Sequence, residues 1–137
     1  MAEKTNANLN KERELLDMVS CYLDAIYYCD VDKLDRVFHP SSSLFDADEG
    51  KLFVDPIASF RADVGSRPSP AGIRQKRVEE IILIDWLSDL SAVVKLRLQA
   101  HDNVFVDHLC FVRGEDGFRI VAKIWHLESK ADIATLD

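Results

Sequence analysis

The chain has 137 residues, enough for one domain with a sizeable hydrophobic core. Its formal net charge of −7 argues against a nucleic-acid-binding protein, which normally carries a basic face. No apolar run approaches the roughly 20 residues that a membrane-spanning helix needs, and the polar start of the chain does not read as a secretory signal. Three cysteines without metal-like spacing indicate a reduced, cytoplasmic protein.

The first long element predicted is a helix over residues 11–29. Tyr22 and Ile26 belong to an apolar stripe with helical spacing, which is typical of a helix that packs on a core. Asn10 precedes the stripe and can cap the helix through its side-chain oxygen. Residues 1–9 are polar, and we expect them to fray.

Two short helices and a hairpin are predicted next. Asp32 is placed to cap a helix over residues 33–38. Residues 43–47 and 51–54 flank an acidic turn that contains glycine, which predicts a small β-hairpin. The Asp-Pro pair at 55–56 predicts the start of a third helix, because aspartate caps well and proline fits the first helical position.

The remainder of the chain predicts four strands, over residues 76–87, 92–100, 103–112 and 118–127. Helices followed by a run of antiparallel strands indicate an α+β fold, with helices packed on one face of a sheet. Because sheets twist, a long sheet can curl around the helices and leave a pocket between them. We therefore expect one domain over residues 1–137, with an ordered core at about 11–128.

The strand predicted at 103–112 carries an acid in an apolar setting. Asp107 shares one face with Phe105 and Leu109, whereas His108 points to the opposite face, where an oligomer interface is the simpler role. An ionised carboxylate among apolar side chains is costly unless a partner compensates it. Two interpretations remain open: Asp107 is hydrogen-bonded or ion-paired within the core, or it belongs to a ligand pocket.

Lys123 and Trp125 alternate with Ile124, so they share a face of the last strand. If Trp125 lines a pocket, Lys123 points there too and could neutralise Asp107 or an anionic ligand. The alternative is a lysine whose stem covers Trp125 from outside. The four histidines are scattered and the glycines occur singly, so neither a metal site nor a cofactor is expected.

The order of elements resembles the nuclear transport factor 2-like superfamily, the cystatin-like cone fold shared by ketosteroid isomerases and SnoaL-like polyketide cyclases. The branch it resembles most is described as putative lumazine-binding. The resemblance extends over roughly residues 11–128 and rests on four segments: Tyr-Leu-Asp-Ala-Ile-Tyr at 22–27, Leu-Asp-Arg-Val-Phe-His-Pro at 34–40, Phe-Val-Asp-His-Leu at 105–109, and Gly-Phe-Arg-Ile-Val-Ala-Lys-Ile-Trp-His at 117–126. It implies the fold more strongly than a function, because this fold hosts enzymes, binding modules and oligomerisation domains.

The resemblance to the isomerases also implies three catalytic roles. Their general base corresponds to Asp46, and their two oxyanion donors correspond to Tyr22 and Asp107. Such a site must bring a base and two donors to one point, since a proton leaves beside a carbonyl whose oxygen becomes negative. The alternative readings are a core tyrosine for Tyr22 and a solvated acid at the edge of a turn for Asp46.

We favour a small-molecule-binding protein, a homodimer joined through its sheet, with a small apolar or aromatic ligand inside the cone. The first alternative is a metal-free isomerase, cyclase or lyase that uses Asp46, Tyr22 and Asp107. The second is a structural dimerisation module without a ligand. The predicted pocket is lined by Tyr22, Ile26, Phe38, Phe105, Asp107, Leu109, Lys123 and Trp125.

Overall fold

A computed structural model describes residues 2–137, with side chains from residue 9 onward. These residues form three α-helices, one short 3-10 helix and six strands, which confirms the α+β class. In chain order the elements are α1 (Ala2–Tyr28), α2 (Val31–Val37), β1 (Phe38–Asp46), β2 (Phe53–Pro56), α3 (Ile57–Ser66), the 3-10 helix η1 (Ala71–Ile73), β3 (Glu79–Ser88), β4 (Ser91–Ala100), β5 (Asn103–Gly114) and β6 (Gly117–Lys130).

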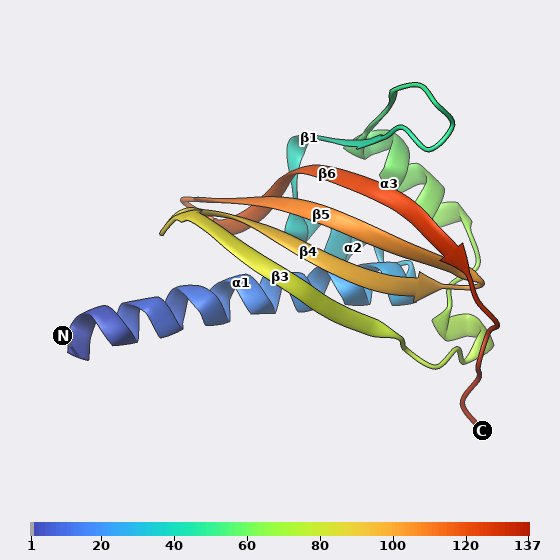
Figure 1. Cartoon of the computed structure of the whole chain (residues 1–137), viewed down its shortest axis with the longest axis horizontal. Helices are drawn as coiled ribbons and strands as arrows, with labels where there is room; N and C mark the ends of the chain where they lie inside the picture. The colour runs from blue at the N-terminus through green and yellow to red at the C-terminus, as the bar shows by residue number, and fades with distance from the viewer. Residues whose placement is uncertain (1) are drawn as a thin grey trace.

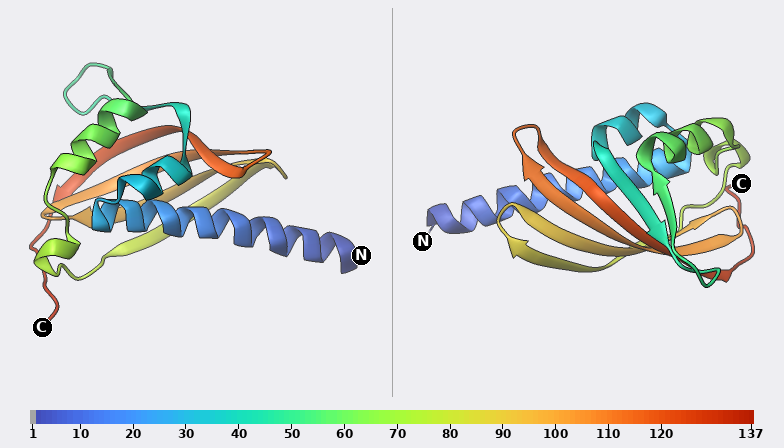
Figure 2. Two further views of the ribbon diagram at one scale, coloured as in Figure 1. Left: turned by 180° about the vertical axis from the view of Figure 1, so that it is seen from behind. Right: turned by 90° about the horizontal axis from the view of Figure 1, so that it is seen from above.

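The strands form one curved sheet in the order β2-β1-β6-β5-β4-β3. β1 lies parallel to β6, whereas the other neighbouring pairs are antiparallel. Figures 1 and 2 show α1 crossing one face of this sheet, with α2 and α3 on the same side. The buried residues of α1 and of the concave face, among them Leu15, Tyr22, Leu96 and Leu109, make up the core between these layers.

The first helix starts earlier than predicted, at Ala2, so the expected cap at Asn10 and the expected fraying of residues 1–9 are wrong over the described part of that segment. Residues 2–10 contain alanine, glutamate, lysine and leucine and no proline or glycine, so nothing interrupts the helix. The helix ends where Cys29 adopts a left-handed φ of 50°. The amide of Asp30 then donates to the carbonyl of Ala25 at 3.0 Å, as in a Schellman cap.

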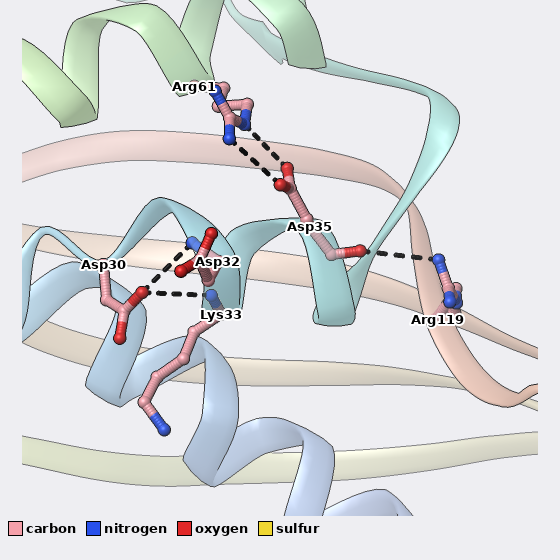
Figure 3. Close-up of polar contacts among 6 residues, drawn as sticks. All are labelled: Asp30, Asp32, Lys33, Asp35, Arg61 and Arg119. Atoms are coloured by element: carbon pink, nitrogen blue, oxygen red, sulfur yellow. Dashed lines mark hydrogen bonds and ion pairs between the residues drawn. The ribbon is translucent and has the colours of Figure 1, made fainter.

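The caps of the two shorter helices also differ from the prediction. Asp30, not Asp32, caps α2: its Oδ1 accepts from the amides of Asp32 at 3.0 Å and Lys33 at 3.3 Å (Figure 3). Pro56 occupies the cap position of α3 without a side-chain hydrogen bond, and Asp55 belongs to β2.

The predicted hairpin is present with shifted strands. β1 begins at Phe38, directly after α2, and β2 runs four residues to Pro56. The turn between them closes with a hydrogen bond from the Gly50 amide to the Ala47 carbonyl at 3.0 Å, and Gly50 takes a φ of +85° that a side chain would strain. This hairpin brings β2 alongside β1, so that Asp55 pairs with Leu44.

Helix α3 is held over one end of the sheet by polar contacts to α2. The guanidinium of Arg61 donates from Nε and Nη2 to the two carboxylate oxygens of Asp35 at 2.8 and 3.1 Å, and Arg119 of β6 donates to the Asp35 carbonyl at 3.5 Å (Figure 3). The Arg61–Asp35 pair ties α3 to α2, with Phe60 buried against the core and Arg61 at the surface.

A bulge in β6 decides which of its side chains face inward. Ile120 and Ala122 pair with neighbouring residues of β5, so Val121 is an extra residue in the ladder. Because the side-chain alternation shifts by one at this point, both Ile120 and Lys123 are buried on the concave side. Without the bulge, the inward position of Ile120 would turn Lys123 and Trp125 toward the convex face.

Candidate functional site

The centre of the candidate site is a buried acid on β5. Asp107 is 1% exposed, and its Oδ2 accepts a hydrogen bond of 2.5 Å from the hydroxyl of Tyr22 on α1. Tyr22 faces this point because α1 crosses the concave face, toward which the alternation of β5 turns Asp107. Burial, and then the charge of Asp107, raise the pKa of the Tyr22 hydroxyl well above its usual value, so Tyr22 remains a hydrogen-bond donor.

The second carboxylate oxygen of Asp107 has no partner. Among the side-chain atoms of the described residues, Oδ1 is the buried polar atom left without a hydrogen bond. An unsatisfied buried acceptor costs about 1–3 kcal/mol, more when it is charged. Since Asp107 also lines a cavity, this oxygen is available to a donor that enters from there.

Lys123 approaches the same carboxylate from β6. Its Nζ lies 3.8 Å from Oδ2 of Asp107, and its side chain is only 8% exposed. The ring centroids of Phe60 and Tyr22 lie 4.8 and 5.2 Å from Nζ. Burial lowers the pKa of the Lys123 amine, and the attraction of Asp107 offsets this only in part.

These three side chains border a cavity of about 240 Å³ between α1, α3, β2 and the concave face of the sheet. Apolar and aromatic groups predominate, and the rings of Phe105 and Trp125 meet edge to face with centroids 5.8 Å apart. The cavity is lined by Tyr22, Ile26, Phe53, Asp55, Phe60, Asp63, Arg67, Leu98, Ala100, Phe105, Asp107, Lys123 and Trp125.

Two residues predicted for the pocket lie behind its wall. Phe38 is 2% exposed and packs its ring against Tyr22 and Phe60, at centroid distances of 6.0 and 6.2 Å. Leu109 is fully buried and pairs with Lys123 across the sheet. The other predicted pocket residues, Tyr22, Ile26, Phe105, Asp107, Lys123 and Trp125, border the cavity itself.

Asp46 lies in a neighbouring hollow. It shares the inner face of β1 with Leu44, as alternation requires, and accepts a hydrogen bond from the amide of Asp48 at 3.2 Å. Its hollow is lined by Asp46, Glu49, Lys51, Phe53 and Trp125, and the last two also line the larger cavity. Tyr22 and Asp107 thus share one cavity, and Asp46 lines a different hollow.

Sequence reasoning missed the wall that β2 and α3 contribute. Phe60, Asp63 and Arg67 recur at helical spacing, a pattern that could have placed them on one face of α3. The clean alternation of β4 likewise marks Leu98 as inward-facing. Phe53 and Asp55 carried no such signal, because their position depends on how the hairpin folds back.

Other features of the chain do not join the cavity. His108 lies on the opposite, exposed face of the sheet. No group of three metal-ligating side chains occurs in the part of the chain that the structure describes. None of the helices within residues 2–137 combines the length and the apolar character that crossing a lipid bilayer requires.

Comparison with known proteins places the chain in a family. A family model described as putative lumazine-binding matches residues 10–126. A comparison with curated proteins gives no match. Among solved structures, a nuclear transport factor 2-like protein of unknown function from Silicibacter pomeroyi is 20% identical, with 88% of this chain and 98% of that chain covered and a TM-score of 0.78.

Two further structures show how widely this fold is shared. A nuclear transport factor 2-like protein of unknown function from Shewanella baltica is 18% identical, with 86% and 94% coverage and a TM-score of 0.76. A cystatin-like fold protein from Burkholderia xenovorans is 12% identical, with 93% and 95% coverage and a TM-score of 0.64. At these identities the solved structures establish only the fold, whereas the family model establishes the family. The chain therefore belongs to the putative lumazine-binding family, and it shares the fold of the nuclear transport factor 2-like structures.

Proposed function

We propose that the protein binds a small, flat, largely apolar molecule in the cavity between α1, α3 and the sheet. The observation that supports this most directly is the unpartnered Oδ1 of Asp107, a buried acceptor beside open space. A ligand that donates an N–H or O–H to this oxygen would remove the cost of leaving it unsatisfied. The volume of about 240 Å³ suits a molecule of one or two rings.

The family name suggests a class of ligand that fits this chemistry. Lumazine is a planar pteridine with N–H donors beside carbonyl acceptors. One such N–H can meet Asp107, while the ring edge packs against Phe105 and Trp125. Lys123 is then placed to donate to a ligand carbonyl, since its Nζ has no acceptor within hydrogen-bond distance among the described residues.

The test is a fluorescence titration of the purified protein with lumazine, compared with the same titration of two matched variants. Asp107→Asn should weaken binding about 10- to 100-fold, the value of one hydrogen bond to a charged group. Asp46→Asn makes the same exchange at a buried aspartate in the neighbouring hollow and should bind like the unmodified protein. Equal weakening by both variants, or no saturable binding together with no co-purifying molecule in native mass spectra, would refute the proposal.

An acid–base enzyme has less support than a binding protein. Its base, Asp46, would have to reach the point where Tyr22 and Asp107 meet a substrate oxygen. Asp46 instead lines a hollow of its own on the far side of the shared residues Phe53 and Trp125. A structural module without a ligand also has less support, because such a protein gains nothing from a buried carboxylate oxygen of Asp107 that has no hydrogen-bond donor.

We propose further that the protein forms a homodimer through the convex face of its sheet. Val112 and Ile124 are 43% and 53% exposed there, which is high for apolar side chains on paired strands. Light scattering after size-exclusion chromatography should give twice the mass of the chain, and Ile124→Lys should halve it. Leu87→Lys, an equally apolar site that is 87% exposed on the edge strand β3, should leave the mass unchanged.

A further inference from the structure

Lys123 is a buried amine whose surroundings do not satisfy an ammonium ion. A charged lysine offers three N–H donors, yet the nearest carboxylate oxygen lies 3.8 Å from Nζ, beyond hydrogen-bond distance. The faces of Phe60 and Tyr22 lie over Nζ and attract an ammonium ion through cation–π contacts, but they supply no hydrogen-bond acceptor. By contrast, Lys11 reaches an oxygen of Asp89 at 2.7 Å on the surface. The site of Lys123 therefore tolerates the neutral amine better than a surface site does.

The charged groups that face Lys123 come from several elements. Asp107 of β5 and Asp55 of β2 favour its charged form, and Arg67 at the end of α3 opposes it. Tyr22 of α1 presents a neutral ring. Burial outweighs these influences and lowers the pKa of Lys123, so a larger share of this amine is neutral at neutral pH than of an exposed lysine. The neutral amine is the form that attacks carbonyl carbons.

We propose that Lys123 captures a small aromatic aldehyde or ketone in the cavity as a reversible imine. The lone pair of Nζ attacks the carbonyl carbon and forms a C–N bond, which gives a carbinolamine. The carbonyl oxygen then leaves with both hydrogens of the amine as water, and a C=N bond forms, so the step needs no oxidant or reductant. This chemistry uses the same cavity as the proposed binding function but does not depend on the hydrogen bond from the ligand to Asp107.

Asp107 is placed to assist the step. Its Oδ2 is the nearest carboxylate oxygen, 3.8 Å from Nζ, and it can take a proton from the nitrogen once the lysine side chain moves to hydrogen-bond distance as the C–N bond forms. The carboxyl group then returns this same proton to the departing oxygen, which leaves as water. Once the imine is protonated, the same carboxylate faces a cation and stabilises it. Phe105 and Trp125 supply the aromatic wall against which the ring of the carbonyl compound packs.

The experiment is reductive trapping with benzaldehyde and cyanoborohydride at neutral pH, followed by peptide mapping of every lysine. We expect Lys123 to gain one benzyl group several-fold faster than Lys76, because its lowered pKa leaves a larger share of the amine neutral and the cavity holds the aldehyde beside it. Lys76 is a suitable reference because it is exposed, precedes β3 and does not line the cavity. Labelling that is uniform across the lysines, or slower at Lys123, would overturn the proposal without needing any variant.

One variant and one titration separate this inference from non-covalent binding. Lys123→Met keeps a side chain of similar length but has no amine, so it should lose the cavity label while the slow labelling of Lys76 continues. Circular dichroism of the same preparation reports whether the fold is intact, whereas lumazine titration is made on the unmodified protein because Lys123 is itself a proposed contact of that ligand. Lumazine binding in a protein whose Lys123 is not labelled would refute the imine and leave the binding function standing. Labelling of Lys123 without lumazine binding would support the imine and refute the pteridine ligand.

Discussion

The hydrogen bond between Tyr22 and Asp107 can be tested by one substitution that keeps the ring. Tyr22→Phe removes the hydroxyl and leaves Oδ2 of Asp107 with Lys123 at 3.8 Å as its nearest charged neighbour. A hydrogen bond to a charged group contributes about 1.5–3 kcal/mol, and here both partners are buried. We therefore expect Tyr22→Phe to lower the free energy of unfolding by about 2 kcal/mol.

The assay is urea denaturation followed by circular dichroism, with Tyr27→Phe as the matched control. The Tyr27 hydroxyl donates at 2.6 Å to the neutral carbonyl of Gln75, so its loss should cost only about 0.5–1.5 kcal/mol. In thermal unfolding the Tyr22→Phe loss corresponds to a Tm lower by about 4–10 °C. A Tyr22 variant that is as stable as the unmodified protein, or more stable than the Tyr27 variant, would refute a charged acceptor at Asp107.

The unmodified protein and Tyr22→Phe should also differ in how their stability changes in alkaline solution. The pKa of Tyr22 is raised in the fold, so at pH above about 10 the unfolded chain releases this proton while the folded chain retains it. The stabilisation is therefore complete below about pH 10 and is lost as the pH rises further. Unfolding measured at about pH 9 and about pH 11 should show a steeper loss for the unmodified protein than for Tyr22→Phe. An equal loss of stability in the two proteins between these pH values would mean that the fold does not raise the pKa of Tyr22.

Two further substitutions, each with a matched control, test the fold around the site. Asp30→Ala removes the cap of α2 and should cost about 1 kcal/mol in urea denaturation. Asp32→Ala, in the first turn, should cost only a few tenths of a kcal/mol through the helix dipole. A larger loss of stability for Asp32→Ala than for Asp30→Ala would mean that Asp32 is the cap. Leu109→Ala empties a fully buried position under Lys123 and should cost about 2–5 kcal/mol. Leu52→Ala, at a residue 70% exposed, should change stability by less than about 0.5 kcal/mol, and a similar loss in both would contradict the assigned core.

Strand alternation carried much of the correct prediction. Because side chains alternate strictly along a strand, placing Phe105 and Leu109 inward also placed Asp107 inward and His108 outward, as the structure shows. The helical stripe through Tyr22 and Ile26 identified the facing wall by the same kind of reasoning. Local periodicity is informative here because each pattern is set by the residues of one element.

What the sequence did not reveal depends on contacts between elements. The bulge at Val121 leaves no compositional signal, yet it decides that Ile120 and Lys123 face the same side. The cap of α2 is Asp30 because α1 ends in a left-handed residue just before it, a choice that residue preferences for capping do not capture. The separation of Asp46 from the cavity follows from the fold of the hairpin, in which Phe53 borders both spaces.

The walls of the cavity come from positions as far apart as Tyr22 and Trp125, on six different elements. The Tyr22–Asp107 hydrogen bond alone spans 85 positions of the chain. A partly folded chain that holds only strands β3–β6 has Asp107 but lacks the Tyr22 hydroxyl that donates to it and the helices that cover the cavity. The proposed binding thus requires the fully assembled chain, so a ligand in the cavity would stabilise the whole fold against unfolding rather than one part of it.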